Sequence, residues 1–311
     1  MKTKLLTILV VLPIFLLTNI SFGQTSLVAG DIAIFQNQAD TPDDFAFVTF
    51  VDIDANTGIY FTDCGSTTSG FISCPGEGAY KYVVPAGGLS AGDIVRFSAN
   101  GSNFSTYSDA LISGTFSLAT LGDQIIAFQD DASATGGANA SANPRFLFII
   151  NNASTLFTGN PIDTNETALP PGLSDTGSPR TAIGVGAGTG VDVEFDNTVY
   201  EGTYDFSGYA TVALAIADAK IAITNPANYR GSNTNPPGDT NYDDAVAAIP
   251  TQLNLMVLSN DEFLSNSFAV YPNPSNGNIT IKNSGVALQN VTITDLNGRT
   301  MGSYEMNGIT T

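Results

Sequence analysis

The chain has 311 residues, with 29 Asp and Glu against 10 Lys and Arg, and a formal net charge of −19. It contains no His and only two Cys, which excludes a Ser-His-Asp triad, imidazole metal ligands and a multi-cysteine zinc site. A surface this acidic repels phosphate backbones, so we expect no nucleic-acid partner. Charged residues make up only 13% of the chain, whereas Gly (31) and Pro (15) are abundant. This composition predicts a mainly β protein whose short strands are joined by many turns.

Residues 1–24 have the pattern of a signal peptide. Lys2 and Lys4 precede an uncharged run from Leu5 to Ile20, and a small, weakly polar stretch follows at 21–24. An N-terminal membrane anchor is the alternative reading, but the run is on the short side for a bilayer span. No later segment is long and apolar enough to span a bilayer. We therefore expect export into the periplasm and no transmembrane anchor.

The two cysteines, Cys64 and Cys74, are ten positions apart in a turn-rich segment. An oxidising compartment outside the cytoplasm would allow them to pair. The alternative is a reactive thiol, but the chain has no His to activate it and the intervening loop has no Lys or Arg. A local disulfide is the prediction, and it would fix one loop without implying catalysis.

Short apolar runs bounded by turn residues recur from Leu27 to about Pro250. Each has strand length and a high content of β-branched or aromatic residues. The predicted strands lie at 30–35, 45–53, 58–62, 80–85, 93–97, 114–118, 124–128 and 145–150. Two segments predict short helices instead, at 209–221 and 243–249. The spacing suits a sandwich or a barrel, and we predict a β-sandwich-like module at 25–250 with one or two short edge helices.

Composition changes again after Thr251. Residues 251–266 are expected to form a linker, and residues 267–311 a small Ig-like β-domain. Its strand 291–296 runs into Asn297-Gly298, a dipeptide that predicts a type I′ hairpin turn. The other conspicuous residues of this region are Tyr271, Pro272, Asn273, Pro274, Gly277 and Asp295.

With Tyr271-Pro272-Asn273-Pro274-Ser275, Gly277 and Asp295-Leu296-Asn297-Gly298-Arg299, the C-terminal region closely resembles the type A sorting domain of type IX secretion, found in certain Gram-negative bacteria. The resemblance implies that the type IX machinery carries the chain from the periplasm across the outer membrane. It also implies that the chain is then released or attached to the cell surface. Members of this family normally continue through a Gly-Xaa-Tyr strand and a basic last strand. Because this sequence stops at Thr311, we expect the sorting domain to be partial, or truncated.

The larger region also resembles an uncharacterised exported bacterial β-module. The segments that carry this weaker resemblance include 30–34, 44–48, 59–63, 85–89, 122–125 and 225–229. Such modules resemble companions of secreted nucleases, phosphatases and adhesins rather than the catalytic units themselves. Related modules often have Asn-Gly-Trp after Phe-Thr-Asp, whereas this chain has Cys64-Gly65. The resemblance therefore implies no activity.

The best candidate for a metal site is the loop 238–244, where Asp239, Asn241 and Asp243 offer oxygen ligands at alternate positions. Calcium prefers such ligands, although the loop matches an EF-hand only in part, because its sixth position is Asp244 and its twelfth is Pro250. The alternative is a solvated loop whose Asp residues cap the following helix.

Other acidic sets are expected to be solvated, and five tyrosines offer a further surface feature. The acidic sets are Asp40 with Asp43 and Asp44, Asp52 with Asp54, Asp130 with Asp131, and Asp192 with Glu194 and Asp196, the last on one face of an expected strand. The tyrosines are Tyr107, Tyr200, Tyr204, Tyr209 and Tyr229. If exposed, they could stack on sugars, although packing in the core is the favoured reading.

These patterns favour a secreted or cell-surface protein whose module binds a glycan or another extracellular polymer without catalysis. Two alternatives stay open, a divalent-metal hydrolase built on carboxylates and a structural spacer without a ligand. A hydrolase predicts convergent acids in one deep cleft, whereas a binding module predicts scattered acids and a shallow aromatic face.

Overall fold

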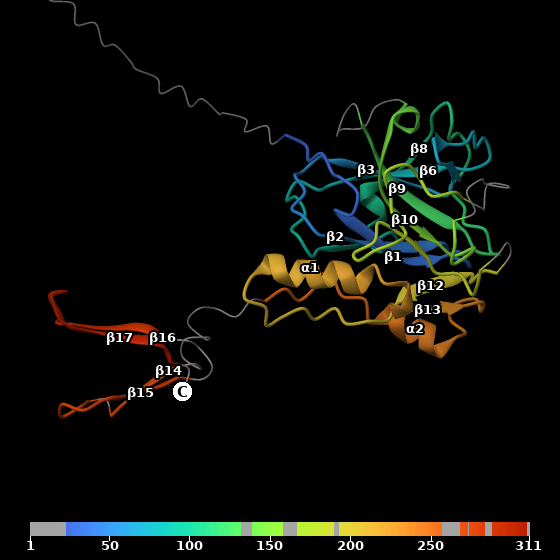
Figure 1. Cartoon of the computed structure of the whole chain (residues 1–311). Helices are drawn as coiled ribbons and strands as arrows, with labels where there is room; N and C mark the ends of the chain where they lie inside the picture. The colour runs from blue at the N-terminus through green and yellow to red at the C-terminus, as the bar shows by residue number, and fades with distance from the viewer. Residues whose placement is uncertain are drawn as a thin grey trace, which may run out of the picture.

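Two packed β-sheets form the main body of the protein (Figure 1). The structure is a computed structural model and describes residues 23–131, 139–157, 167–189, 193–256, 268–272, 274–283 and 288–309. Residues 1–22 of the expected signal peptide, most of the expected linker, Asp192 and Asn273 lie outside the described residues. The prediction of a mainly β, sandwich-like fold with two short helices is confirmed.

The first sheet has five strands and is antiparallel throughout. In spatial order its strands are β13 (Tyr229–Ser232), β12 (Asn197–Tyr200), β1 (Ile32–Gln38), β2 (Asp44–Thr49) and β7 (Ile94–Arg96). A bulge between Ile34 and Gln36 shifts the register of β1 against β2. Bulges of this kind increase the local twist of a strand.

The second sheet has six strands and packs against the first. Its order is β11 (Ala182–Gly184), β10 (Pro144–Asn151), β9 (Gln124–Asp130), β3 (Gly58–Thr62), β6 (Ala79–Val83) and β8 (Phe104–Tyr107). Only the pairing of β10 with β11 is parallel. A two-residue hairpin, β4 (Ser66–Thr67) with β5 (Gly70–Phe71), extends from the loop after β3.

Aromatic side chains fill the space between the two sheets. Phe45 of β2 is fully buried, and its ring centroid lies 5.0 Å from that of Phe61 of β3 in the opposite sheet. Phe97, Phe104 and Phe116 surround the same ring at 5.2–5.9 Å. Such ring pairs add to the stabilisation that burial alone provides. The prediction that most phenylalanines belong to the core is consistent with this cluster.

Two helices pack beside the first sheet (Figure 1). Helix α1 (Val212–Ile223) contacts β1, and helix α2 (Thr240–Ala247) contacts β12 and β13. Helix α1 begins three residues later than the predicted start at Tyr209, because Thr211 is the N-cap and its side chain accepts a hydrogen bond from the Leu214 N–H. Helix α2 begins three residues earlier than predicted, because Asp239 is its N-cap.

Residues 251–256, expected to begin the linker, are hydrogen-bonded to the module. The Leu253 N–H donates to the Gly92 carbonyl (2.8 Å), and the Ile94 N–H donates to the Thr251 carbonyl (2.9 Å). Leu253 is also buried in the core. The packed module therefore reaches Met256 in the structure.

The C-terminal region contains two antiparallel hairpins. The first pairs β14 (Phe268–Tyr271) with β15 (Thr280–Asn283), and the second pairs β16 (Leu288–Thr294) with β17 (Thr300–Ile309). The turn of the second hairpin is not type I′ as predicted, because Gly298 has a positive φ (80°) and Asn297 does not. The Gly298 N–H donates to the Asp295 carbonyl (2.9 Å), which closes the turn before Gly298.

Within the described part of the chain, no helix is long and apolar enough to cross a bilayer.

Candidate functional site

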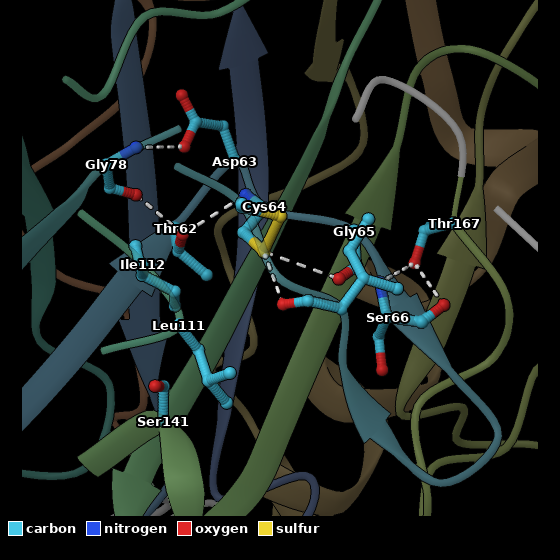
Figure 2. Close-up of a disulfide and its surroundings, with 12 residues drawn as sticks. Thr62, Asp63, Cys64, Gly65, Ser66, Gly78, Leu111, Ile112, Ser141 and Thr167 are labelled. Atoms are coloured by element: carbon cyan, nitrogen blue, oxygen red, sulfur yellow. Dashed lines mark hydrogen bonds between the residues drawn. A yellow bond between two sulfur atoms is a disulfide. The ribbon is translucent and has the colours of Figure 1, made fainter. Parts of the chain in front are cut away.

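The disulfide predicted between Cys64 and Cys74 is confirmed (Figure 2). Both residues are fully buried, with their Cα atoms 5.8 Å apart, and the chain has no free cysteine. The Cys74 N–H donates to the Leu111 carbonyl (2.7 Å), and the Cys64 N–H donates to the Thr62 hydroxyl (3.1 Å). The bridge therefore fixes the loop after β3 and leaves no thiol for nucleophilic chemistry.

Asp63, directly before the bridge, is a fully buried acid. Its Oδ1 accepts a hydrogen bond from the Gly78 N–H at 3.1 Å (Figure 2), and its Oδ2 accepts one from the Ser117 N–H at 2.7 Å. Burial raises the pKa of Asp63 to about 8, and the neighbouring Glu77 carboxylate contributes to this rise. A carboxyl group with such a pKa is a common sign of a functional site, although structural networks produce the same effect.

Three carboxylates hold three consecutive backbone amides at this place. The Ser117 N–H donates to Asp63, the Leu118 N–H to Asp43 (2.9 Å) and the Ala119 N–H to Asp123 (2.9 Å). We call Asp43, Asp63 and Asp123, with residues 117–119, the carboxylate clamp.

The environment of the clamp disfavours ionisation of its three acids. Burial raises the pKa of Asp43. Burial, with the Asp63 charge beside it, raises the pKa of Asp123 well above its usual range. A second hydrogen bond to Asp123 comes from the Gln124 N–H (2.7 Å). Because these carboxylates are engaged by backbone amides, they hold the segment 117–119 in place rather than present free oxygens to a ligand.

The predicted calcium ligands lie at the start of helix α2. Asp239 is the N-cap, and its Oδ1 accepts hydrogen bonds from the Asn241 and Tyr242 N–H groups at 3.1 and 3.3 Å. Asp243 Oδ2 accepts one from the Gly238 N–H at 2.9 Å. The capping interaction lowers the pKa of Asp239, chiefly through the bond from Tyr242. Calcium at Asp239, Asn241 and Asp243 stays a prediction.

The other acidic sets do not converge on one point. Asp44 receives the Arg96 guanidinium at 2.7 Å, whereas Asp40 receives the Asn197 amide at 2.7 Å. Asp52 Oδ1 accepts a hydrogen bond from the Ala91 N–H (2.9 Å). Across the residues that the structure describes, no group of three Asp, Glu, Cys or His side chains could hold a metal ion.

The acids Asp192, Glu194 and Asp196 were expected on one face of a strand. The described residues 193–196 are not part of a strand, because β12 begins at Asn197. Burial and the charges of Asp40 and Glu194 raise the pKa of Asp196 to about 6.

The tyrosines considered as a sugar-stacking platform are packed instead. Tyr200 is almost completely buried, and its ring lies 5.4 Å from that of Tyr204 and 5.9 Å from that of Tyr229. Tyr107 packs against Tyr60 with ring centroids 4.5 Å apart, and Tyr209 packs against the core. These rings therefore do not form an exposed aromatic face.

Two adjoining surface hollows form a shallow groove, whose lining combines polar residues with apolar ones such as Ile53, Val84 and Leu89. The first, of about 250 Å³, includes Asp52, Asp54 and Ser90, and the second, of about 350 Å³, includes Asn56 and Asn103. The hollows share Ala86, so they form one feature, which we call the polar groove. None of the carboxylate-clamp acids lines either hollow. The sequence patterns did not predict this groove, because its lining comes from segments at 52–56, 83–90 and 102–105, which are far apart along the chain.

The motif residues of the C-terminal region lie at the ends and turns of the two hairpins. Tyr271 is the last residue of β14, and Pro272 and Gly277 lie in the connection to β15, where Gly277 has a φ of 125°. Asp295 and Gly298 form the turn between β16 and β17, where the Asp295 carboxylate accepts hydrogen bonds from the Asn297 and Arg299 N–H groups at 2.9 Å.

Comparison with known proteins identifies this region and no other. Residues 269–311 match the family model of the secretion system C-terminal sorting domain. No curated protein and no solved structure matches the chain. The sorting domain shows that the chain is exported by type IX secretion to the cell surface or the medium, and that the type IX machinery is its partner. The resemblance of residues 27–250 to exported β-modules stays a prediction.

Proposed function

We propose that residues 25–256 form a non-catalytic binding module that attaches to an extracellular polymer, with a glycan as the ligand. In this proposal a signal peptide at 1–24 leads the chain into the periplasm, and a linker at 257–266 joins the module to the sorting domain. The sorting domain then directs the chain across the outer membrane.

The single observation that carries the proposal is that the three acids of the carboxylate clamp are hydrogen-bonded to backbone amides. A hydrolase built on carboxylates, the catalytic alternative considered above, would need carboxylates facing its substrate. The carboxylate clamp binds Asp43, Asp63 and Asp123 to backbone amides instead. Asp63 and Asp123, the carboxyl groups whose pKa values are raised furthest, therefore have structural partners, which favours a binding module over a hydrolase.

The polar groove is the proposed place of ligand contact. Asn56 and Ser102 are exposed, Asn103 is half-buried, and hydroxyl and amide groups of this kind exchange hydrogen bonds with sugar hydroxyls. The combined volume of the two hollows lies within the range of about 300–1,000 Å³ that is typical of small-ligand sites. A groove that is shallow and open suits a chain-like ligand that passes along the surface.

Binding to a panel of insoluble and soluble polysaccharides tests the proposal. The exported chain would be compared with the variants Asn56→Gly and Asn103→Ala, since Gly accepts the positive φ of Asn56 (65°). Thr106→Ala is the matched control, because Thr106 is exposed on β8 beside the groove but does not line it. We expect one polymer to bind, and to bind more weakly to the two groove variants but not to the control.

Two outcomes would contradict this function. Failure to bind any polymer would favour the spacer alternative. Hydrolysis of a bound polymer that requires a divalent cation would favour the hydrolase alternative.

A further inference from the structure

Arg180 differs from the other arginines of the chain. Arg96, Arg145, Arg230 and Arg299 each form an ion pair with an Asp or Glu, at 2.5–2.7 Å. Within the described residues the Arg180 guanidinium has no acidic partner, and its Nε donates only a long hydrogen bond of 3.4 Å to the Gly177 carbonyl. In a chain with almost three acids for each base, an arginine without a carboxylate beside it is unexpected.

Two adjoining hollows surround this side chain. Both are lined by Arg180 and Thr224, and their volumes are about 230 and 90 Å³. Lys220 lines the smaller hollow, and its Nζ lies 5.3 Å from the centroid of the Phe50 ring. No Asp or Glu lines either hollow. We call the two hollows together the cationic depression.

Helix α1 ends beside the cationic depression, and its last carbonyls do not need Arg180 or Lys220 as hydrogen-bond donors. Basic residues commonly bond to the last carbonyls of a helix. Here the Lys220 carbonyl accepts the Thr224 hydroxyl (2.7 Å), the Ala222 carbonyl accepts the Asn228 amide (2.8 Å) and the Ile223 carbonyl accepts the Tyr229 hydroxyl (2.8 Å). These neutral donors bond to three of the last four carbonyls of the helix. The helix dipole adds only about half a negative charge there, against two full positive charges.

The backbone around Arg180 is held in place before any ligand arrives. The Arg180 N–H donates to the Thr224 hydroxyl (3.0 Å), which connects the loop 174–181 to α1. The Thr181 and Ala182 N–H groups both donate to the Ser174 carbonyl (3.0 Å), which closes the loop on itself. A cation on a fixed backbone loses less conformational entropy when it binds an anion. Ile221, which is 44% exposed, adds an apolar surface to the same lining.

From these observations we infer that the cationic depression binds the oxyanion group of an acidic sugar unit, a carboxylate or a sulfate. The planar guanidinium of Arg180 is suited to two parallel hydrogen bonds with such a group, and the Lys220 ammonium adds a second charge. Ile221 offers the apolar contact that a sugar ring needs. The inference deepens the proposed function and rests on it, because it assigns an acidic polysaccharide as the polymer.

Calorimetric titration of the exported chain tests the inference. The probes are a galacturonate oligomer, dextran sulfate, neutral dextran, and glucuronate as a free monosaccharide. The variants are Arg180→Gln and Lys220→Gln, with Arg230→Gln as the control. The control removes the same charge, but from an exposed ion pair with Glu201 whose loss has little effect on stability. Melting curves verify that each variant is folded, which is expected because the Arg180 backbone makes the bond to Thr224.

We expect at least one anionic probe to bind, with an affinity that falls as salt rises. Arg180→Gln should weaken this binding about tenfold or more, as for loss of a charged hydrogen bond, and Lys220→Gln less. Equal affinity in Arg180→Gln and in the wild type, or no binding of either anionic polymer or of glucuronate, would overturn the inference. If neutral dextran binds to the wild type and to Arg180→Gln alike, the proposed function stands and the cationic depression fails. If glucuronate alone binds, and only to the wild type, the depression stands and polymer binding fails.

Discussion

The Asp63 carboxylate accepts a hydrogen bond of 2.7 Å from the backbone N–H of Ser117, a residue 54 positions further along the chain. The bond joins the end of β3 to a segment that has no strand partner of its own. Asp43 and Asp123 hold the next two amides in the same way. The structure therefore uses the buried Asp63 and Asp123 and the half-buried Asp43 where a sheet would use backbone carbonyls. The raised pKa values of these acids make the stability of the module depend on pH.

We expect the module to be less stable at pH 8.5 than at pH 5.5. The folded-state pKa of Asp63 is raised to about 8 and that of Asp123 is raised well above its usual range, whereas both are near 4 in the unfolded chain. The folded protein therefore binds more protons across this range, and its stability falls as pH rises through about 8. The slope is on the order of 1 kcal/mol per pH unit for each such group. Urea unfolding at several pH values measures it.

The absence of His makes this measurement easy to interpret. No ordinary side chain of the chain titrates between pH 5.5 and 8.5, so the slope reports the perturbed acids. Glu77→Gln removes one cause of the raised pKa of Asp63 and should make the slope smaller. A stability that is constant or rises from pH 5.5 to 8.5 would show that the clamp acids ionise normally.

Replacing Cys64 and Cys74 together by Ala should lower the free energy of unfolding by about 3 kcal/mol. This figure follows from the loop-closure entropy of a bridge between residues ten apart. The bridge stabilises the fold by lowering the conformational entropy of the unfolded chain, not by adding contacts in the folded one. Ala is used because a Ser hydroxyl would have to be buried at these fully buried positions. Thermal unfolding with and without reductant is the measurement. The wild type, once reduced in the unfolded state, should resemble the double variant. Equal stability of the oxidised wild type and the double variant would mean that the bridge contributes nothing.

The strands that could be predicted from sequence are those with continuous apolar residues. The runs at 124–128 and 145–150 became β9 and β10 because Ile and Phe fill both faces of the second sheet. Strands β12 and β13 were not predicted, because Asn197, Thr198 and Gly231 give no apolar signal. Their place in the sheet comes from pairing with β1 and with each other.

The carboxylate clamp and the cationic depression lie beyond what sequence patterns could give. The segment 114–118 was predicted as a strand, yet it forms only an isolated bridge between Glu77 and Thr115, and its later amides bond to acids. Partners 54 and 75 positions apart leave no local pattern. Arg180 and Lys220 likewise come together only through the fold, whereas Cys64 and Cys74 are close in sequence and their pairing could be predicted.

Asp239→Ala should lower the free energy of unfolding in the presence of EDTA, because helix α2 loses its N-cap. Calcium titration of the same two proteins tests the predicted site at Asp239, Asn241 and Asp243. A bound ion would raise the melting temperature of the wild type according to its concentration and affinity, and the variant would lose this rise. Asp244→Asn is the control, because it changes a charge in α2 without touching the N-cap. A wild type whose melting temperature is the same in calcium and EDTA would remove the calcium prediction and leave the cap.

Asp295→Ala should reduce the amount of chain exported through type IX secretion, whereas Asp295→Asn should retain most of it. The Asp295 side chain accepts the N–H groups of Asn297 and Arg299, and Gly298 takes the positive φ that completes the turn. An Asn side chain can accept the same backbone bonds, so the turn survives in that variant. The Asp295→Asn variant loses only the ion pair with Arg299. The Arg299 side chain is 77% exposed, so this ion pair contributes little to stability.

Immunoblots of cells and medium measure export, with Lys282→Gln as an exposed control in the same domain. If Asp295→Asn fails as completely as Asp295→Ala, the machinery recognises the charge at this turn rather than its shape.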